Sequence, residues 1–161
     1  MVLYDIATHL LTNVFDALTE CYPSECEPLA AYVTLGNGDD GIKDSLTVSI
    51  ASVVGSNNTR PGGLGLWRST FNVILRESGW PTARVDGETI VLPSPSEQAA
   101  AARPVFAMGE AMHRRLAYMM THRGLVPGAC SSATLGLLTP LNPQGGVVGW
   151  SVPVVADLPW N

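Results

Sequence analysis

The sequence predicts an α+β fold, with a mixed, mainly antiparallel sheet of about four to six strands. An N-terminal helix and one long central helix are expected to pack on one face of that sheet. Three observations support this prediction: an N-terminal apolar stripe at helical spacing, several segments in which apolar and polar residues alternate, and a second helical stretch with a clear start signal. The 161 residues suit one domain, residues 1–161, with a sizeable core.

The first predicted element is an amphipathic helix over residues 3–20. Apolar residues recur there at the i, i+3, i+4, i+7 spacing that places them on one face of a helix. Pro23 follows and marks the end of the helix. The stripe consists of Leu3, Ile6, Ala7, Leu10, Leu11, Val14, Phe15 and Leu18.

Strands are predicted to follow this helix. Residues 29–35 form a short one, and residues 46–50 alternate apolar with small polar side chains. Residues 67–76 form a long strand with one mostly apolar and one mostly polar face. Residues 83–92 contain Asp-Gly between two short β-forming runs, so this segment forms either a small hairpin or an edge strand.

The long central helix has a clear N-terminal signal. Ser94 is suited to cap it, Pro95 stands at its first position, and Glu97 can close a capping box. The helix is expected to end near His122. Pro104 lies inside it and removes one backbone hydrogen bond, so a kink or a break is expected there.

Residues 124–156 contain no charged side chain. Two strands are predicted in this segment, Thr134–Leu138 and Val147–Val155, joined by the Pro- and Gly-rich residues 140–146. An uncharged hairpin of this length is expected to be either central in the sheet or buried against another chain.

The composition is poor in charge. Charged residues make up 14% of the chain, against roughly 25% in typical soluble domains. Either copies of the chain cover part of its surface, or that surface is rich in Ser, Thr, Asn and Gly, and composition alone favours neither. The 14 acidic and 9 basic residues give a net charge of −5, which disfavours a duplex-DNA reader because the basic footprint for phosphates is missing.

No targeting or membrane segment is predicted. The N-terminus lacks a basic region and a cleavable apolar run, and no stretch of about 18 apolar residues occurs. Three cysteines, Cys21, Cys26 and Cys130, form an odd set without a disulfide framework. This cysteine usage predicts a reducing, cytoplasmic site of synthesis.

No metal site is predicted. Cys21 and Cys26 are spaced too far apart for the tight pairs of structural zinc sites, and no second pair follows. In the acidic loop around Asp39 and Asp40, glycines stand where an EF-hand needs its first ligands. The three histidines, His9, His113 and His122, are explained more simply as surface or helix-end residues.

The motifs of common enzymes and cofactor sites are also missing. The sequence has no Gly-rich phosphate loop followed by Lys and no Gly-x-Ser-x-Gly nucleophile elbow. It has no pair of carboxylates at helical spacing either. We therefore predict no catalytic residue and no cofactor, and an enzyme is disfavoured.

The order of elements resembles that of tail terminators and related head-to-tail joining (neck) proteins of long-tailed bacteriophages, those of actinobacterial hosts in particular. The likeness covers nearly the whole chain and rests on element order. It lies in the N-terminal helix Leu3–Leu18, the long strand Ser69–Leu75, the Ala-rich helix Ser96–Arg123, and the closing turn and strand Pro143–Trp150.

The resemblance implies a homo-oligomeric ring, commonly of six copies, on the head-proximal end of the tail tube. Such a ring stops polymerisation of the tube protein and docks the head connector or stopper, while DNA passes through its lumen without specific binding. Subunits of a closed ring meet through heterologous contacts. The candidate interface residues are Leu64, Val147, Val148, Trp150, Leu158 and Trp160, and the candidate lumen charges are Asp39 and Asp40.

Other interpretations remain open. For Trp150, a place in the core of a strand is an alternative to a place at an interface. For the whole chain, one alternative is a head-completion (stopper) or minor tail protein of the virion neck. A further alternative is a small cytosolic α+β enzyme or ligand-binding domain.

Overall fold

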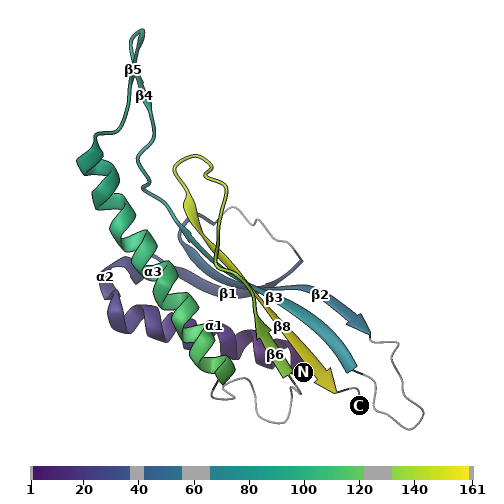
Figure 1. The fold of residues 1–161 in the computed structure, drawn as a ribbon. Helices are drawn as coiled ribbons and strands as arrows, with labels where there is room; N and C mark the ends of the chain where they lie inside the picture. Colours follow the sequence, from purple (N-terminus) through teal and green to yellow (C-terminus); the bar gives the residue numbers. More distant parts are fainter. Residues whose placement is uncertain (1, 37–41, 56–65, 122–131, 160–161) are drawn as a thin grey trace.

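The structure, a computed structural model, describes residues 2–36, 42–55, 66–121 and 132–159. It is an α+β fold with two layers, in which a six-stranded mixed sheet carries helices on one face (Figure 1). The strand order is β1-β2-β3-β8-β6, and β7 pairs with β8 beyond this path. The predicted fold class is therefore confirmed.

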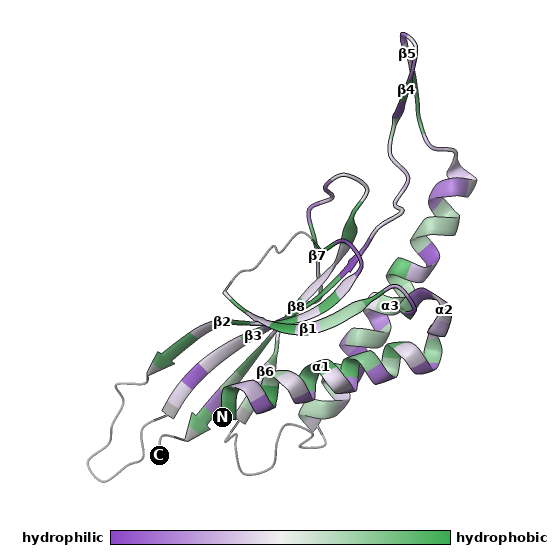
Figure 2. Cartoon of the chain, turned by 180° about the vertical axis from the view of Figure 1, so that it is seen from behind, coloured by the Kyte–Doolittle hydropathy of each residue, from purple (hydrophilic) through white to green (hydrophobic). Residues whose placement is uncertain are grey.

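The N-terminal helix forms as its apolar spacing predicts. Helix α1 spans Val2–Cys21, and a short second helix, α2, spans Pro23–Cys26. Apolar and polar residues form bands along α1 in Figure 2, and its apolar stripe faces the sheet. Six residues of α1 are buried: Ile6, Ala7, Leu10, Leu11, Val14 and Leu18.

The first three strands of the sheet are β1 (Ala30–Leu35), β2 (Ser45–Gly55) and β3 (Leu66–Glu77). Strand β2 runs parallel to β1 and antiparallel to β3, with a register shift between Ile50 and Ser52. The prediction for residues 46–50 located β2 but underestimated its length.

Two buried serines of β2 hold the ends of the connection from β1. The Ser49 hydroxyl donates a hydrogen bond to the Gly36 carbonyl, and the Ser45 hydroxyl donates one to the Ile42 carbonyl at 3.2 Å. Both serines are fully buried. Hydrogen bonds from Ser to backbone carbonyls are common in turns, and these two satisfy the buried hydroxyls of Ser45 and Ser49.

Between β3 and the long helix, the chain forms a projecting hairpin. Strand β4 (Arg84–Asp86) pairs antiparallel with β5 (Thr89–Val91) in a separate two-stranded sheet. Gly87 has a φ of 64°, which suits glycine at the start of a two-residue hairpin turn. Of the two predictions for residues 83–92, the small hairpin is the one that the structure has.

Helix α3 spans Pro95–Thr121. The Ser94 hydroxyl accepts a hydrogen bond from the Glu97 amide at 3.2 Å, so Ser94 caps the helix as predicted. The helix continues through Pro104 without interruption, so the expectation of a break there is wrong. After Pro104, residues of α3 such as Met108 and Met112 pack against the core. This packing stabilises the helix beyond the proline.

The uncharged C-terminal segment lies inside the sheet. It forms β6 (Ser132–Leu135), β7 (Thr139–Pro140) and β8 (Val148–Pro159), with β8 between β3 and β6. Of the two expectations for this hairpin, the central position in the sheet is observed for β8 alone, because β6 and β7 lie at the edge of the sheet. Strand β8 also extends beyond the predicted Val155 and so includes Asp157, which pairs with Arg68 of β3 in the sheet register.

The prediction of one strand over residues 134–138 is wrong, because β6 ends at Leu135 and pairing with β8 resumes only in β7. The Gly136 amide donates a hydrogen bond to the Pro153 carbonyl at 2.8 Å. A Cβ atom at Gly136 would lie only 2.3 Å from Cγ of Pro153. At Gly136 the chain therefore passes so close to β8 that only glycine fits.

The two faces of the sheet differ in chemistry. The face toward the helices carries the apolar core, which includes Phe71 and Leu75 of β3 and Val154 of β8. On the opposite face, β2 contributes the hydroxyl residues Ser45, Thr47 and Ser49, which are buried, and Ser49 is the register neighbour of Asn72 in β3. Small uncharged polar residues thus occupy interior positions on this face of β2.

Candidate functional site

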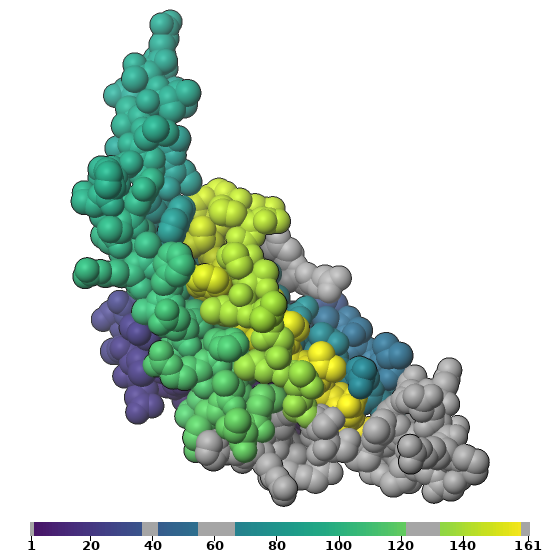
Figure 3. Space-filling view, in the orientation of Figure 1, coloured from purple at the N-terminus to yellow at the C-terminus, as the bar shows by residue number. Residues whose placement is uncertain are grey.

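The β4–β5 hairpin, referred to below as the arm, is the most exposed apolar feature of the described residues. Val85, Ile90 and Leu92 are 76%, 67% and 73% exposed. The arm extends away from the sheet and beyond the N-terminal end of α3, and the space-filling view shows it projecting from the body (Figure 3). Its apolar side chains therefore do not pack into the core of their own chain.

The outer face of α3 carries exposed aromatic residues together with arginine. Phe106 and Tyr118 are each more than half exposed, and Arg114 is exposed between them. The spacing of 106, 110, 114 and 118 places these residues along one stripe of the helix. The Arg115 guanidinium lies 5.9 Å from the centre of the Tyr118 ring, within the range of a cation–π contact.

Trp150 joins β8 to α3. Its Nε1 donates a hydrogen bond to the Val105 carbonyl at 2.9 Å, and its ring meets the Phe106 ring edge-to-face at a centroid distance of 5.5 Å. A Cβ atom at Gly109 would come within 2.6 Å of the indole, so glycine is needed where the ring crosses the helix. Trp150 is thus partly buried and packs against the core of its own chain, as in the alternative interpretation that placed it in the core of a strand.

The other predicted interface residues fall into two groups. Val148 and Leu158 are buried within the chain itself, and Val147 is half-buried. Their burial leaves little side-chain surface for a neighbour. Leu64, Trp160 and the predicted lumen charges Asp39 and Asp40 lie outside the described residues, as do Cys130 and His122.

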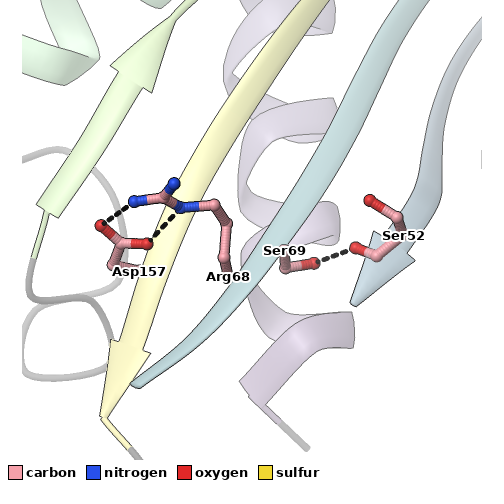
Figure 4. A network of polar contacts seen from close by, with 4 residues as sticks. All are labelled: Ser52, Arg68, Ser69 and Asp157. Atoms are coloured by element: carbon pink, nitrogen blue, oxygen red, sulfur yellow. Dashed lines mark hydrogen bonds and ion pairs between the residues drawn. The ribbon is translucent and has the colours of Figure 1, made fainter. Parts of the chain in front are cut away.

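Polar contacts join the last residues of β2 and β8 to the first residues of β3 (Figure 4). Arg68 of β3 forms an ion pair with Asp157 of β8 at 2.9 Å, and the Ser69 hydroxyl donates a hydrogen bond to the Ser52 carbonyl at 3.2 Å. These contacts tie β3 to both neighbouring strands. The same end of the sheet exposes Val54 of β2, so it provides a second, smaller apolar surface.

A cavity of about 350 Å³ lies where α2, the end of β3 and the first half of α3 meet. Three carboxylates line it: Glu25 of α2, Asp44 before β2, and Glu77 at the end of β3. Asp44 accepts hydrogen bonds from the Ser78 amide and hydroxyl, both at 2.9 Å to Oδ1. The remaining walls are Pro28, Ser78, Gly79, Trp80, Ala101, Pro104 and Val105.

Glu77 is the most perturbed carboxylate of the described chain. It is only 8% exposed, and its Oε2 has no hydrogen-bond partner within residues 2–36, 42–55, 66–121 and 132–159. Burial, followed by the negative charges of Asp44 and Glu25, raises its pKa to about 7. Nearby, burial raises the pKa of the Cys26 thiol, which keeps that side chain neutral.

Within residues 2–36, 42–55, 66–121 and 132–159, no three His, Cys, Asp or Glu side chains are placed to hold a metal ion. Among the same residues, no helix is both long and apolar enough to cross a membrane.

The arm and the acidic cavity were not predicted as sites from the sequence. Glu25, Asp44 and Glu77 are far apart in the chain, so no local motif links them. One signal was available: Glu77 continues the alternation of Phe71, Val73 and Leu75, the core-facing residues of β3. A carboxylate at a position that the alternation assigns to the core indicates a buried charge.

No known protein family matches the sequence, and no curated protein matches it.

Proposed function

We propose that this chain is a structural virion protein that forms a ring at the head-proximal end of a phage tail. There it ends polymerisation of the tail tube and joins the tail to the head connector, while DNA passes through the lumen. The resemblance to tail terminators implies six copies in that ring. The observation that carries the proposal is the exposed apolar arm, which suits contact with a copy of the same chain.

The arm has a physical reason to bind a neighbour. A two-stranded hairpin alone is marginally stable in water, and each strand of the arm has only three residues. Covering one exposed Val, Leu or Ile side chain contributes roughly 1.5–3 kcal/mol. Burial of Val85, Ile90 and Leu92 against a second protein surface therefore supplies a large part of the free energy that a stable contact needs.

The outer face of α3 is a suitable counterpart for the arm on another copy. It presents Phe106, Tyr118 and Arg114, and aromatic residues and arginine are enriched at interface hot spots. The arm carries Asp86 and Glu88 as well as Arg84, and the α3 stripe carries Arg114 as well as Glu110, so acidic residues of the arm can pair with Arg114. A contact between two different patches of identical subunits generates a closed ring or an open filament.

The proposal is tested by the mass of the purified chain in light scattering, alone and after addition of the tail tube protein from the same genome. We expect self-association in solution or on the tube, and rings with a central opening in electron micrographs. A chain that stays monomeric at every concentration and binds neither tube nor connector contradicts the proposal.

The arm is tested separately with Ile90→Ser. This change removes an exposed apolar side chain and is expected to weaken association by about tenfold or more. The matched control is Leu137→Ser, since Leu137 is also highly exposed but lies outside the arm. Equal effects of the two substitutions would rule out a specific role for the arm.

The stopper alternative predicts a different phenotype. Loss of a terminator gives overlong or unjoined tails, whereas loss of a stopper gives leaking heads and normal free tails. Inactivation of the gene in an infecting phage, followed by electron microscopy of the lysate, therefore separates these two functions.

A further inference from the structure

The cavity between α2, the end of β3 and α3 combines negative charge with apolar walls. Glu25, Asp44 and Glu77 come from three separate segments, and their mutual repulsion contributes to the raised pKa of Glu77. The lining of the cavity also includes Trp80 and Pro104. Carboxylates facing aromatic and aliphatic surface are the surroundings that bind an organic cation, through ion pairs and cation–π contact.

In addition to the clustering of three carboxylates, the burial of Glu77 is a second observation that points to a ligand. Its side chain is more than nine-tenths buried, it lines the cavity, and Oε2 lacks a partner among the described residues. A buried polar atom without a hydrogen bond costs free energy, on the order of 1–3 kcal/mol and more for a charged group. A bound donor with a positive charge removes that cost, whereas an apolar ligand does not.

The arrangement of these carboxylates distinguishes among cations. Within the described chain they are not placed to converge on one metal ion. Asp44 already accepts hydrogen bonds from Ser78, so it contributes charge more than free acceptor positions. A planar cation with several N–H donors can reach separated acceptors at once, as guanidinium does.

We propose that this cavity is a binding site for an organic cation of the guanidinium class, held by Glu77 with Glu25 and Asp44 and packed against Trp80 and Pro104. The cation is either a free amine-type metabolite or the arginine side chain of a partner protein. This site is independent of the proposed ring function, because it uses neither the arm nor the outer face of α3.

The first test is isothermal titration calorimetry of the whole chain with butylguanidinium, and with butylurea as its uncharged analogue. We expect saturable binding of butylguanidinium, with no binding of butylurea. Binding of neither compound, or equal binding of both, overturns the proposal.

The second test uses Glu77→Gln, which keeps the shape of the side chain and removes its charge. Butylguanidinium affinity is expected to fall by about tenfold or more, as for loss of a charge-assisted hydrogen bond. The matched control is Glu20→Gln on α1, which removes the same charge at an exposed position outside the cavity lining and is expected to bind as the wild type does. Unchanged affinity in Glu77→Gln overturns the proposal, and Glu25→Gln provides the same test if Glu77→Gln does not fold.

The source of the cation is addressed by comparing agmatine with acetyl-arginine amide. Tighter binding of agmatine supports a free metabolite, and tighter binding of the blocked arginine supports a side chain of a partner. Because the ring proposal is tested by molecular mass and the cavity by calorimetry, failure of one leaves the result for the other unaffected.

Discussion

Gly109 shows how one residue determines the packing of the C-terminal strand on α3. In a helix interior, alanine is normally more favourable than glycine by about 1 kcal/mol. Here, however, a Cβ atom would lie 2.6 Å from the Trp150 ring, which is fixed by its hydrogen bond to Val105. Replacing Gly109 by alanine therefore improves helix propensity but adds steric crowding, and these two effects change the stability in opposite directions.

We predict that Gly109→Ala destabilises the protein by about 1–3 kcal/mol, because overpacking outweighs the gain in helix propensity. Chemical denaturation measures this change. Ala117→Gly, in the same helix, serves as a reference for helix propensity alone. A Gly109→Ala protein more stable than the wild type would mean that the indole moves aside without cost.

Glu77 makes stability depend on pH. Its pKa is about 7 in the folded protein, above the ordinary value of 4.5, so the folded state binds the proton more tightly. The contribution of this group to stability is fully present below about pH 4.5 and is lost as pH rises through 7. Above pH 7, the folded protein carries a buried negative charge beside Asp44 and Glu25.

We predict that Glu77→Gln stabilises the protein above pH 7, by on the order of 1–2 kcal/mol once solvent screening is allowed for. Near pH 4 the variant and the wild type should have similar stability, because Glu77 is then protonated in both states. Thermal unfolding across this pH range provides the measurement. A difference between the two proteins that is constant with pH would contradict the assignment of the raised pKa to Glu77.

At the scale of elements, the arm is structurally separate from the sheet. It pairs only within itself in the described strands, and its apolar residues are exposed. We predict that replacing residues 84–91 with a short Gly-Ser linker leaves the thermal unfolding temperature within a few degrees of the wild type, whereas association is lost. Calorimetry and light scattering measure the two effects, and a large loss of stability would show that the arm supports the body.

The elements that are predicted best from the sequence are those with local signals. Helix α1 follows from its apolar spacing, and the start of α3 follows from Ser94, Pro95 and Glu97. Strand β6 is predicted too long because its end depends on the approach of Gly136 to Pro153, which are distant in sequence. The continuity of α3 through Pro104 likewise depends on tertiary packing that a local proline rule does not include.

The candidate sites were less predictable than the elements. Trp150 stands out in the sequence, but only the structure places its ring against Val105 and Phe106. The acidic cavity forms when α2, β2 and β3 bring Glu25, Asp44 and Glu77 together. Such a site has no local pattern, because its residues are neighbours only after the sheet and helices pack.

At the scale of the whole molecule, charge is distributed unevenly. Residues 2–36 contain five acidic side chains and no basic one, whereas α3 carries the arginines Arg103, Arg114 and Arg115 together with Glu97 and Glu110. The N-terminal part of the chain is therefore acidic, and α3 has a small excess of positive charge.

We predict that Arg114→Glu weakens self-association, because it places a negative charge on the surface proposed to meet Asp86 and Glu88. Combining it with Glu88→Arg restores part of the association by exchanging the charges, and sedimentation velocity measures both effects. A double variant no better than Arg114→Glu alone would argue against contact between the arm and this helix face.

The position of β8 in the sheet has a consequence for synthesis of the chain. This strand lies between β3 and β6, yet it follows every other described element in the sequence. During translation, α1 and β1–β3 therefore leave the ribosome before the strand that completes their core exists. Folding is accordingly dominated by contacts between distant parts of the chain, which is typical of slow folding. A nascent chain interrupted before residue 148 exposes the unpaired edge of β3, and chaperones and proteases recognise such incompletely folded chains.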